Sequence, residues 1–168
     1  MQTKRSLELD SKTKTEQCND ALDGNHRTDN IVLLPSTSFT SSDERFDHFV
    51  KRDGLTFAGT HLVIDLWGAS QIDDIEHIET TLKQCVKEAG ATLLNIHLHR
   101  FSPNGGVSGV VVLAESHISV HTWPECYYAA FDIFMCGEAQ PYKSVDVLKT
   151  AFKPERINVG DHRRGIVA

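Results

Sequence analysis

The sequence lacks the long apolar run that a membrane-spanning helix needs, which is about 20 consecutive residues. It begins MQTKRSLELD, a stretch without the apolar core of a secretion signal. Cysteine is scarce, and no CxxC pair occurs among Cys18, Cys85, Cys126 and Cys136. These absences predict a cytoplasmic chain with no membrane partner and no dense disulfide framework.

Basic residues are fewer than acidic residues in this chain. The chain has 17 Lys and Arg residues against 23 Asp and Glu residues, which gives a formal net charge of −6. It has no basic stripe with interleaved aromatic residues, which is the pattern that nucleic-acid-binding proteins present to phosphates. We therefore expect no nucleic-acid partner. A cationic small substrate is compatible with this balance, although charge alone does not predict one.

The length suits one domain. A chain of 168 residues with 40% hydrophobic residues can bury one core of ordinary size, and it is too short for two generous domains. Residues 1–55 are polar and rich in Ser and Thr, which predicts a mostly flexible extension with at most a short helix at 43–51. The ordered domain is expected to span residues 56–168.

Alternating apolar residues predict a series of strands in that domain. In THLVIDLW (60–67), Leu62, Ile64 and Leu66 share one face. In ATLLNIHLHRF (91–101) the corresponding face carries apolar residues from Leu94 to Leu98. Further strands are predicted at 107–114, 117–123, 128–135 and 156–160.

Two amphipathic helices complete the pattern. Asp73 is placed to cap a helix whose apolar stripe runs from Ile75 to Ala89, and Gly90 is placed to end it. A second helix is expected to start at Pro141. Because the middle strands have short connections, they must pair antiparallel. The fold class that follows is α/β (α+β), a two-layer sandwich with a mainly antiparallel sheet and the helices packed on one face.

The stretch LAESHISVHTWPE (113–125) is unusual because polar residues interrupt an apolar alternation. The apolar positions expected to lie on a buried strand face are Val110, Val112, Ile118 and Val120. The polar residues among them are Glu115, Ser116, His117 and His121. Burying a polar side chain costs free energy unless it is paired. The cluster therefore predicts either a satisfied hydrogen-bond network or a functional site.

A serine hydrolase is disfavoured on the residues alone. Ser116 and His117 are adjacent, so in a regular strand they point to opposite faces and cannot pair as nucleophile and base. The sequence also lacks the GxSxG elbow of the α/β hydrolases. A hydrolase would need His121 or another histidine to approach Ser116 in space.

A metal site is also disfavoured. His97 and His99 lie two residues apart on one strand face and could share a zinc ion. The candidates for a third ligand have no diagnostic spacing; they are Asp65, His61 and Cys136. We therefore expect no metal. Taken singly, Cys136 is typical of a small buried hydrophobic residue, and Glu115 and Glu125 are typical of charges at strand ends.

Taken together, GVSGVVVLAESHISVHTWPECYYAAFDIFMCG (Gly106–Gly137) closely resembles the core of the prokaryotic S-adenosylmethionine decarboxylases, which depend on a pyruvoyl group. This run of 32 residues contains GVSGV, ESH, HTWPE and FxCG in the family's order and spacing. The segments HLVIDLWG, EAGAT and HRFSPNGG extend the resemblance over about residues 59–160. The chain departs from the family in its N-terminal extension and in a turn at 104–106 that is one residue longer.

The resemblance implies a self-processing proenzyme that converts S-adenosylmethionine to decarboxylated S-adenosylmethionine (S-adenosylmethioninamine) and CO₂ for spermidine biosynthesis. Cleavage is implied between Glu115 and Ser116, so that Glu115 ends a β chain and a pyruvoyl cofactor made from Ser116 begins an α chain. Backbone strain at this link could assist the cleavage. The pyruvoyl group would form a Schiff base with the substrate amine and accept electrons as CO₂ leaves.

The resemblance also implies roles in processing and catalysis. His121 matches the family's processing histidine and is the expected base for the Ser116 α-proton, and Ser108 matches a serine that supports processing. Cys136 matches the residue that returns a proton to the substrate, a reasonable role because a thiol has a pKa within reach of neutrality. His117 receives no role.

Substrate contacts are implied for Phe101, Glu125 and Asp65. Phe101 matches an aromatic residue that packs on adenine and faces the sulfonium, Glu125 matches an acceptor for the ribose hydroxyls, and Asp65 matches an acidic position. The family further implies a homodimer of β–α pairs with active sites close to the subunit interface.

Two alternatives remain open on the sequence. A pyruvoyl enzyme of this fold could decarboxylate arginine or ornithine, although the presence of Phe101, His121 and Glu125 favours a nucleoside substrate. A non-enzymatic binding module would be expected to lack Ser116, His121 or Cys136, and the chain has all three.

Overall fold

The computed structural model describes residues 48–167. The elements follow the predicted order, with a short hairpin before the first long strand. They are β1 (Val50–Arg52), β2 (Leu55–Phe57), β3 (Gly59–Trp67), α2 (Ile75–Ala89), β4 (Leu93–Arg100), β5 (Val107–Leu113), β6 (Ser116–Trp123), the 3₁₀ turn η2 (Pro124–Cys126), β7 (Tyr128–Met135), α3 (Lys143–Phe152) and β8 (Arg156–Arg164).

Most of the predicted N-terminal extension, 1–55, lies outside the described residues. The short helix expected at 43–51 is described only at its end, where Val50 and Lys51 belong to strand β1 instead. β1 pairs antiparallel with β2, so hairpin structure precedes Thr56.

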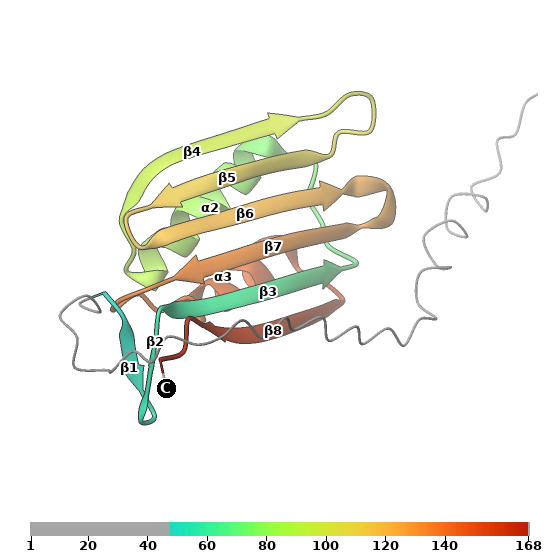
Figure 1. Ribbon diagram of the computed structural model, residues 1–168. Helices are drawn as coiled ribbons and strands as arrows, with labels where there is room; N and C mark the ends of the chain where they lie inside the picture. The colour runs from blue at the N-terminus through green and yellow to red at the C-terminus, as the bar shows by residue number, and fades with distance from the viewer. Residues whose placement is uncertain (1–47, 168) are drawn as a thin grey trace, which may run out of the picture. The chain divides into compact units, whose positions relative to one another are not determined.

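The main sheet has six strands in the order β4-β5-β6-β7-β3-β8, and every neighbouring pair is antiparallel. Both helices lie against the same face of this sheet (Figure 1). The predicted two-layer sandwich with a mainly antiparallel sheet is therefore confirmed. We call the face without helices the open face.

The start of α2 differs by one residue from the prediction. Asp74, rather than Asp73, is the N-cap, and its side chain accepts hydrogen bonds from the backbone N–H groups of Glu76 and His77. Asp74 has the extended backbone of a cap residue, with φ of −91° and ψ of 101°. Gly90 ends the helix as predicted, in a left-handed conformation with φ of 70°.

The core lies between the sheet and the helices. Leu62, Ile64 and Leu66 are fully buried on the helix side of β3, as predicted. Ile118 and Val120 of β6 are fully buried on the same side. Burial of each such side chain contributes roughly 1.5–3 kcal/mol. This packing holds the strands rigidly, and the strands in turn set the positions of the polar residues between them.

The open face carries apolar side chains that the sequence placed elsewhere. Val110 and Val112 were expected to be buried, but they are 38% and 42% exposed, while their neighbours Val111 and Leu113 point into the core. Leu94 is 62% exposed because a register shift between Leu93 and Asn95 interrupts β4, which is an edge strand. The valines therefore belong to the same face as the polar cluster.

The last elements extend the sheet past β3. α3 begins at Lys143, two residues after the expected start at Pro141. β8 runs to Arg164, which is longer than the predicted 156–160, and it pairs with the full length of β3. Within residues 48–167 we find no helix with the length and apolarity required to cross a membrane.

Candidate functional site

The peptide bond between Glu115 and Ser116 lies at the turn between β5 and β6, beside the end of β7. The Glu115 carbonyl oxygen accepts two hydrogen bonds from Cys136, one from its backbone N–H at 3.1 Å and one from its Sγ at 3.0 Å. Cys136 follows directly after β7, which pairs with β6 such that Ser116 lies opposite Met135. Two donors on one carbonyl oxygen polarise that carbonyl toward attack by a nucleophile.

The side chain of Glu115 is anchored separately. Its carboxylate accepts hydrogen bonds from the Thr92 backbone N–H at 2.8 Å and from the Thr92 Oγ1 at 3.1 Å. Thr92 lies between α2 and β4, 23 positions away in the sequence, so no local pattern could have identified it. Glu115 is thus fixed at both its carbonyl and its carboxylate.

Ser116 has an unusual backbone conformation, with φ of 150°. Only glycine adopts this region readily, and another residue held there costs roughly 1–3 kcal/mol. The strain expected at this link is therefore present in the fold.

The same conformation overturns the prediction that Ser116 and His117 cannot meet. Ser116 Oγ lies 3.1 Å from His117 Nδ1, within hydrogen-bonding distance. The prediction assumed a regular strand, in which successive side chains point to opposite faces. The positive φ of Ser116 breaks that alternation and turns its hydroxyl toward the neighbouring ring. We call Glu115, Ser116, His117 and Cys136 the cleavage-site group.

A polar network on the open face lies next to this group. The rings of His61 and His117 meet edge to face, with centroids 6.4 Å apart. His61 Nε2 is 3.4 Å from Asp132 Oδ1, and it is buried without a hydrogen bond that satisfies normal geometry. Asp132 accepts a hydrogen bond from Ser119 Oγ at 2.9 Å. Burial lowers the pKa of His61; the attraction of Asp132 opposes this shift, and the charge of Arg164 adds to it.

A second set of residues gathers at the far end of β5 and β6. Ser108 Oγ is 2.8 Å from His121 Nδ1 across the ladder that joins these strands. The His121 ring lies beside Trp123, with centroids 6.2 Å apart. The resemblance had grouped Ser108 with His121, and the fold brings the two side chains into contact.

Phe101 and Glu125 lie at the same end. Phe101 is 48% exposed and packs edge to face on His99, with centroids 4.7 Å apart. Glu125 belongs to η2, and its Oε1 accepts a hydrogen bond from Asn104 Nδ2 at 3.5 Å. Since Asn104 lies in the loop after Phe101, this contact joins the two segments that carry the predicted substrate contacts.

Asp65 lies two strands away from His121 in the same row of the sheet, because His121 is opposite Ala130 and Ala130 is opposite Asp65. Its Oδ1 accepts a hydrogen bond from Tyr128 Oη at 2.6 Å. Burial and this hydrogen bond raise the pKa of Tyr128 well above its usual range. The Tyr128 ring also packs at a tilt against Trp67, with centroids 4.3 Å apart. Sequence reasoning did not single out Tyr128, although it lies only three residues after the end of the HTWPE motif.

The two sets of residues do not meet within one chain. We call Phe101, Ser108, His121, Glu125 and Asp65 the distal group. His121 lies five residues along β6 from Ser116. At about 3.3 Å per residue, their Cα atoms are roughly 16 Å apart. A His121 side chain therefore cannot reach the Ser116 α-proton of its own chain.

The histidines considered as zinc ligands lie on the edge strand β4. His97 and His99 both project from β4, but no three His, Cys, Asp or Glu side chains in residues 48–167 come together as a metal site. Of the two free cysteines in this range, Cys85 is fully buried in the core, and burial raises the pKa of its thiol to about 12. Cys136 is the half-buried one.

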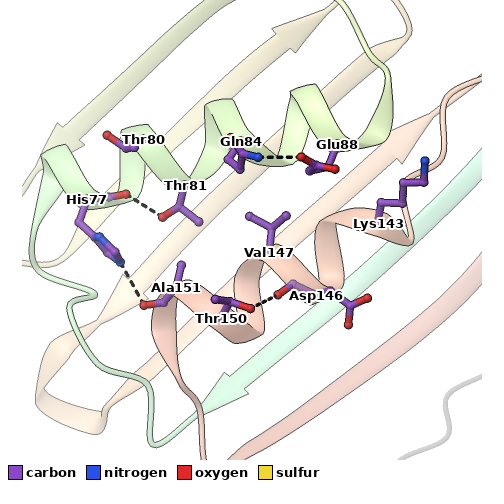
Figure 2. A pocket seen from close by; sticks show the side chains of 10 residues that line it. All are labelled: His77, Thr80, Thr81, Gln84, Glu88, Lys143, Asp146, Val147, Thr150 and Ala151. Atoms are coloured by element: carbon purple, nitrogen blue, oxygen red, sulfur yellow. Dashed lines mark hydrogen bonds between the residues drawn. The ribbon is translucent and has the colours of Figure 1, made fainter.

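A groove of about 590 Å³ lies between α2 and α3, on the other side of the sheet from the open face. Figure 2 shows His77 of α2 reaching across to the Ala151 carbonyl of α3, a contact of 3.1 Å. None of the predicted site residues lines this groove. The groove is therefore separate from the chemistry at Ser116.

Comparisons with known proteins match this chain to one enzyme family. The family model for S-adenosylmethionine decarboxylase matches residues 60–165. The S-adenosylmethionine decarboxylase proenzyme of Methanococcus maripaludis strain C5 is 48% identical over 112 residues, which cover 65% of this chain and 91% of that protein. The protein of the same name from Thermomicrobium roseum is 40% identical over 110 residues, covering 65% of this chain and 95% of that protein.

A solved structure is similar as well. The crystal structure of the adenosylmethionine decarboxylase from Aquifex aeolicus VF5 matches with a TM-score of 0.61 and 40% sequence identity. The match covers 67% of this chain and 94% of that chain.

Proposed function

The chain belongs to the S-adenosylmethionine decarboxylase family, and we propose that it cleaves itself between Glu115 and Ser116 and then converts S-adenosylmethionine to S-adenosylmethioninamine and CO₂. The product is the aminopropyl donor of spermidine biosynthesis. The observation that carries the proposal is the Glu115 carbonyl, which is held by two donors of Cys136 next to a strained, hydrogen-bonded Ser116.

Self-cleavage uses only groups of the chain. The Ser116 hydroxyl attacks the Glu115 carbonyl carbon, and the oxygen that becomes negative is the one that accepts the Cys136 hydrogen bonds. Breaking the peptide C–N bond leaves an ester and a free Ser116 amine. Loss of the Ser116 α-proton expels the Glu115 carboxylate, and hydrolysis of the resulting dehydroalanine releases ammonia and leaves the pyruvoyl group. The strained φ of Ser116 is relieved when the peptide bond breaks.

The two products stay together because they are interleaved in one sheet. The β chain ends at Glu115 and supplies β3, β4 and β5, while the α chain supplies β6, β7 and β8. β3 lies between β7 and β8, and β5 pairs with β6. Separating the chains would break three strand ladders, so cleavage does not disperse the site.

The residues present suit the group that cleavage produces. The pyruvoyl carbonyl supplies an electron sink for the bond to CO₂ when it is joined to the substrate amine. Cys136 Sγ already reaches the scissile carbonyl, so we assign it as the acid that protonates the substrate α-carbon after CO₂ leaves. Phe101 and Glu125 are assigned to adenine and to the ribose hydroxyls.

A second copy of the chain completes the site in this proposal. The distal group lies roughly 16 Å from Ser116 along β6, too far to act on it in the same chain. The open face carries apolar side chains that are partly exposed: Val63, Val110, Val112 and Trp123. Packing two open faces about a two-fold axis buries these residues. It also lays the distal group of one chain over the cleavage-site group of the other.

Release of labelled CO₂ tests the activity. The wild-type chain is expected to release CO₂ from carboxyl-labelled S-adenosylmethionine. Carboxyl-labelled arginine and ornithine are assayed separately, in equal amounts, as the alternative substrates. A Ser116→Ala chain, which lacks the pyruvoyl precursor, is the matched control. Release from arginine or ornithine but not from S-adenosylmethionine would contradict the substrate, and equal release by the Ser116→Ala chain would contradict the mechanism.

A further inference from the structure

His117 has no role in the mechanism above, yet it is the side chain in contact with the Ser116 hydroxyl. Its Nδ1 lies 3.1 Å from Ser116 Oγ, whereas His121 lies five residues farther along β6. When the ring carries its proton on Nε2, Nδ1 is free to accept the Ser116 O–H. The nearest base to the nucleophile is thus the adjacent residue and not the histidine assigned to the α-proton.

We propose that His117 is the general base of the first step, the transfer of the Glu115 acyl group from the Ser116 nitrogen to the Ser116 oxygen. This role rests on the proposed self-cleavage and assigns its first proton transfer. His117 touches the reacting oxygen, so it is a catalytic residue of processing, and its action is separate from that of His121.

The step balances within the cleavage-site group. Nδ1 of His117 takes the proton from Ser116 Oγ as Oγ bonds to the Glu115 carbonyl carbon. The negative charge collects on the carbonyl oxygen, which accepts the N–H and Sγ hydrogen bonds of Cys136. The C–N bond then breaks, and the same Nδ1 proton passes to the leaving Ser116 nitrogen. The products are an ester and an amine, and His117 is restored to its neutral form.

The backbone conformation explains why an adjacent residue can act in this way. In a regular strand the two side chains would point to opposite faces. The φ of 150° at Ser116 brings its hydroxyl to the His117 ring. One distortion therefore both strains the backbone beside the bond that breaks and pairs the nucleophile with a base.

The surroundings of His117 include apolar and ionisable side chains from three neighbouring strands. Opposite it in the sheet lie Val112 on β5 and Phe134 on β7. His61 of β3 meets its ring edge to face, and Asp132 of β7 lies beside His61. Within residues 48–167, the ionisable groups near this row also include Glu115, Cys136, His162 and Arg164, the last of which lies over the Phe134 ring at 5.3 Å.

The test compares variants of the full chain made by cell-free synthesis, with self-cleavage followed over time and over pH. His117→Asn keeps an acceptor close to the position of Nδ1 but removes the basic ring nitrogen. His77→Gln is the matched control, because His77 lies on α2 and Gln can still donate to the Ala151 carbonyl. We expect His117→Asn to slow cleavage at least about 100-fold and to remove the wild-type decline in rate at acidic pH, with no change for His77→Gln.

Hydroxylamine, which cleaves esters at neutral pH, shows which step is lost. A chain stopped before acyl transfer has no ester, so His117→Asn should stay intact in hydroxylamine. A His121→Asn chain should instead be cut at 115–116, because it is stopped after the ester forms. If His117→Asn lowers the melting temperature, the His117→Ala chain is tested in its place. We expect added imidazole to restore self-cleavage in that chain.

The outcomes separate this inference from the proposed function. Cleavage of His117→Asn at the wild-type rate and pH profile overturns the inference alone, as does an ester that hydroxylamine cuts in that variant. Failure of imidazole to restore cleavage in His117→Ala also overturns it. A wild-type chain that never cleaves at 115–116 overturns the proposed function itself.

Discussion

Cys136 holds the Glu115 carbonyl oxygen through two hydrogen bonds, one from its backbone N–H and one from its Sγ. This relationship places the residue proposed as the catalytic acid against the carbonyl of the peptide bond that is proposed to be cleaved first. The same side chain would serve processing as a hydrogen-bond donor and decarboxylation as a proton donor. The first role needs only a hydrogen-bond donor, whereas the second needs a group that gives up its proton, so substitutions of Cys136 can separate the two roles.

Cys136→Ser is expected to cleave itself at close to the wild-type rate, because the hydroxyl can still donate to the Glu115 carbonyl. Cys136→Ala should cleave at least about tenfold more slowly, since only the backbone donor remains. Both processed chains should lose most of their decarboxylation rate, because a serine hydroxyl is a far weaker acid than a thiol. Precursor decay and CO₂ release are measured on the same samples. Equal cleavage by the Ala and Ser variants would refute the role of Sγ in processing.

The strain at Ser116 can be measured with two chains that cannot cleave. Ser116→Ala and Ser116→Gly both lack the nucleophile, but only glycine adopts φ of 150° readily. The Gly variant is therefore expected to be more stable than the Ala variant by about 1–2 kcal/mol in the free energy of unfolding. Urea unfolding of the two purified precursors provides the value. A Gly variant that is less stable than the Ala variant would show that the conformation costs nothing.

The two-copy site predicts complementation between defective chains. A His121→Asn chain and a Ser116→Ala chain are each expected to remain uncleaved alone. When they are co-expressed, the mixed dimer holds one site with an intact Ser116 from the first chain and an intact His121 from the second. The His121→Asn chain should then be cleaved, which tags of different mass would reveal. An absence of cleavage, with mixed dimers present by native mass spectrometry, would mean that His121 acts within its own chain.

His61 should make the fold sensitive to acid. Burial lowers its pKa in the folded chain below the value in the unfolded chain. The unfolded state therefore binds more protons as the pH falls through the unfolded pKa, about 6.5, and stability falls with it. His61→Phe cannot titrate and should lose less stability between pH 7.5 and pH 5.5, a window of about two units around that value. Urea unfolding midpoints across this window test the prediction, and identical slopes for both chains would contradict it.

The sheet could be predicted from alternation alone where one face is buried by the helices. Leu62, Ile64 and Leu66 followed that rule. The antiparallel order of the middle strands was predicted instead from their short connections. Val110 and Val112 did not follow the alternation rule, because an apolar residue on the open face has the same periodicity as one in the core. Alternation reveals that two faces exist, but it does not say which face the helices cover.

For the site, the sequence suggested which residues take part but not which of them are in contact. The resemblance proposed the site residues, and the separation of Ser116 and His121 along β6 follows once both are placed on one strand. The contact between Ser116 and His117 was missed because a positive φ at a serine leaves no mark on the sequence. Thr92 was missed because its contact with Glu115 joins segments 23 residues apart.

Intact mass spectrometry of the purified full chain tests the central claim most directly. The account predicts two chains, one ending at Glu115 and one beginning with a blocked residue that is lighter than serine by the mass of ammonia. A single chain of 18.7 kDa that retains Ser116 as an ordinary serine would contradict it.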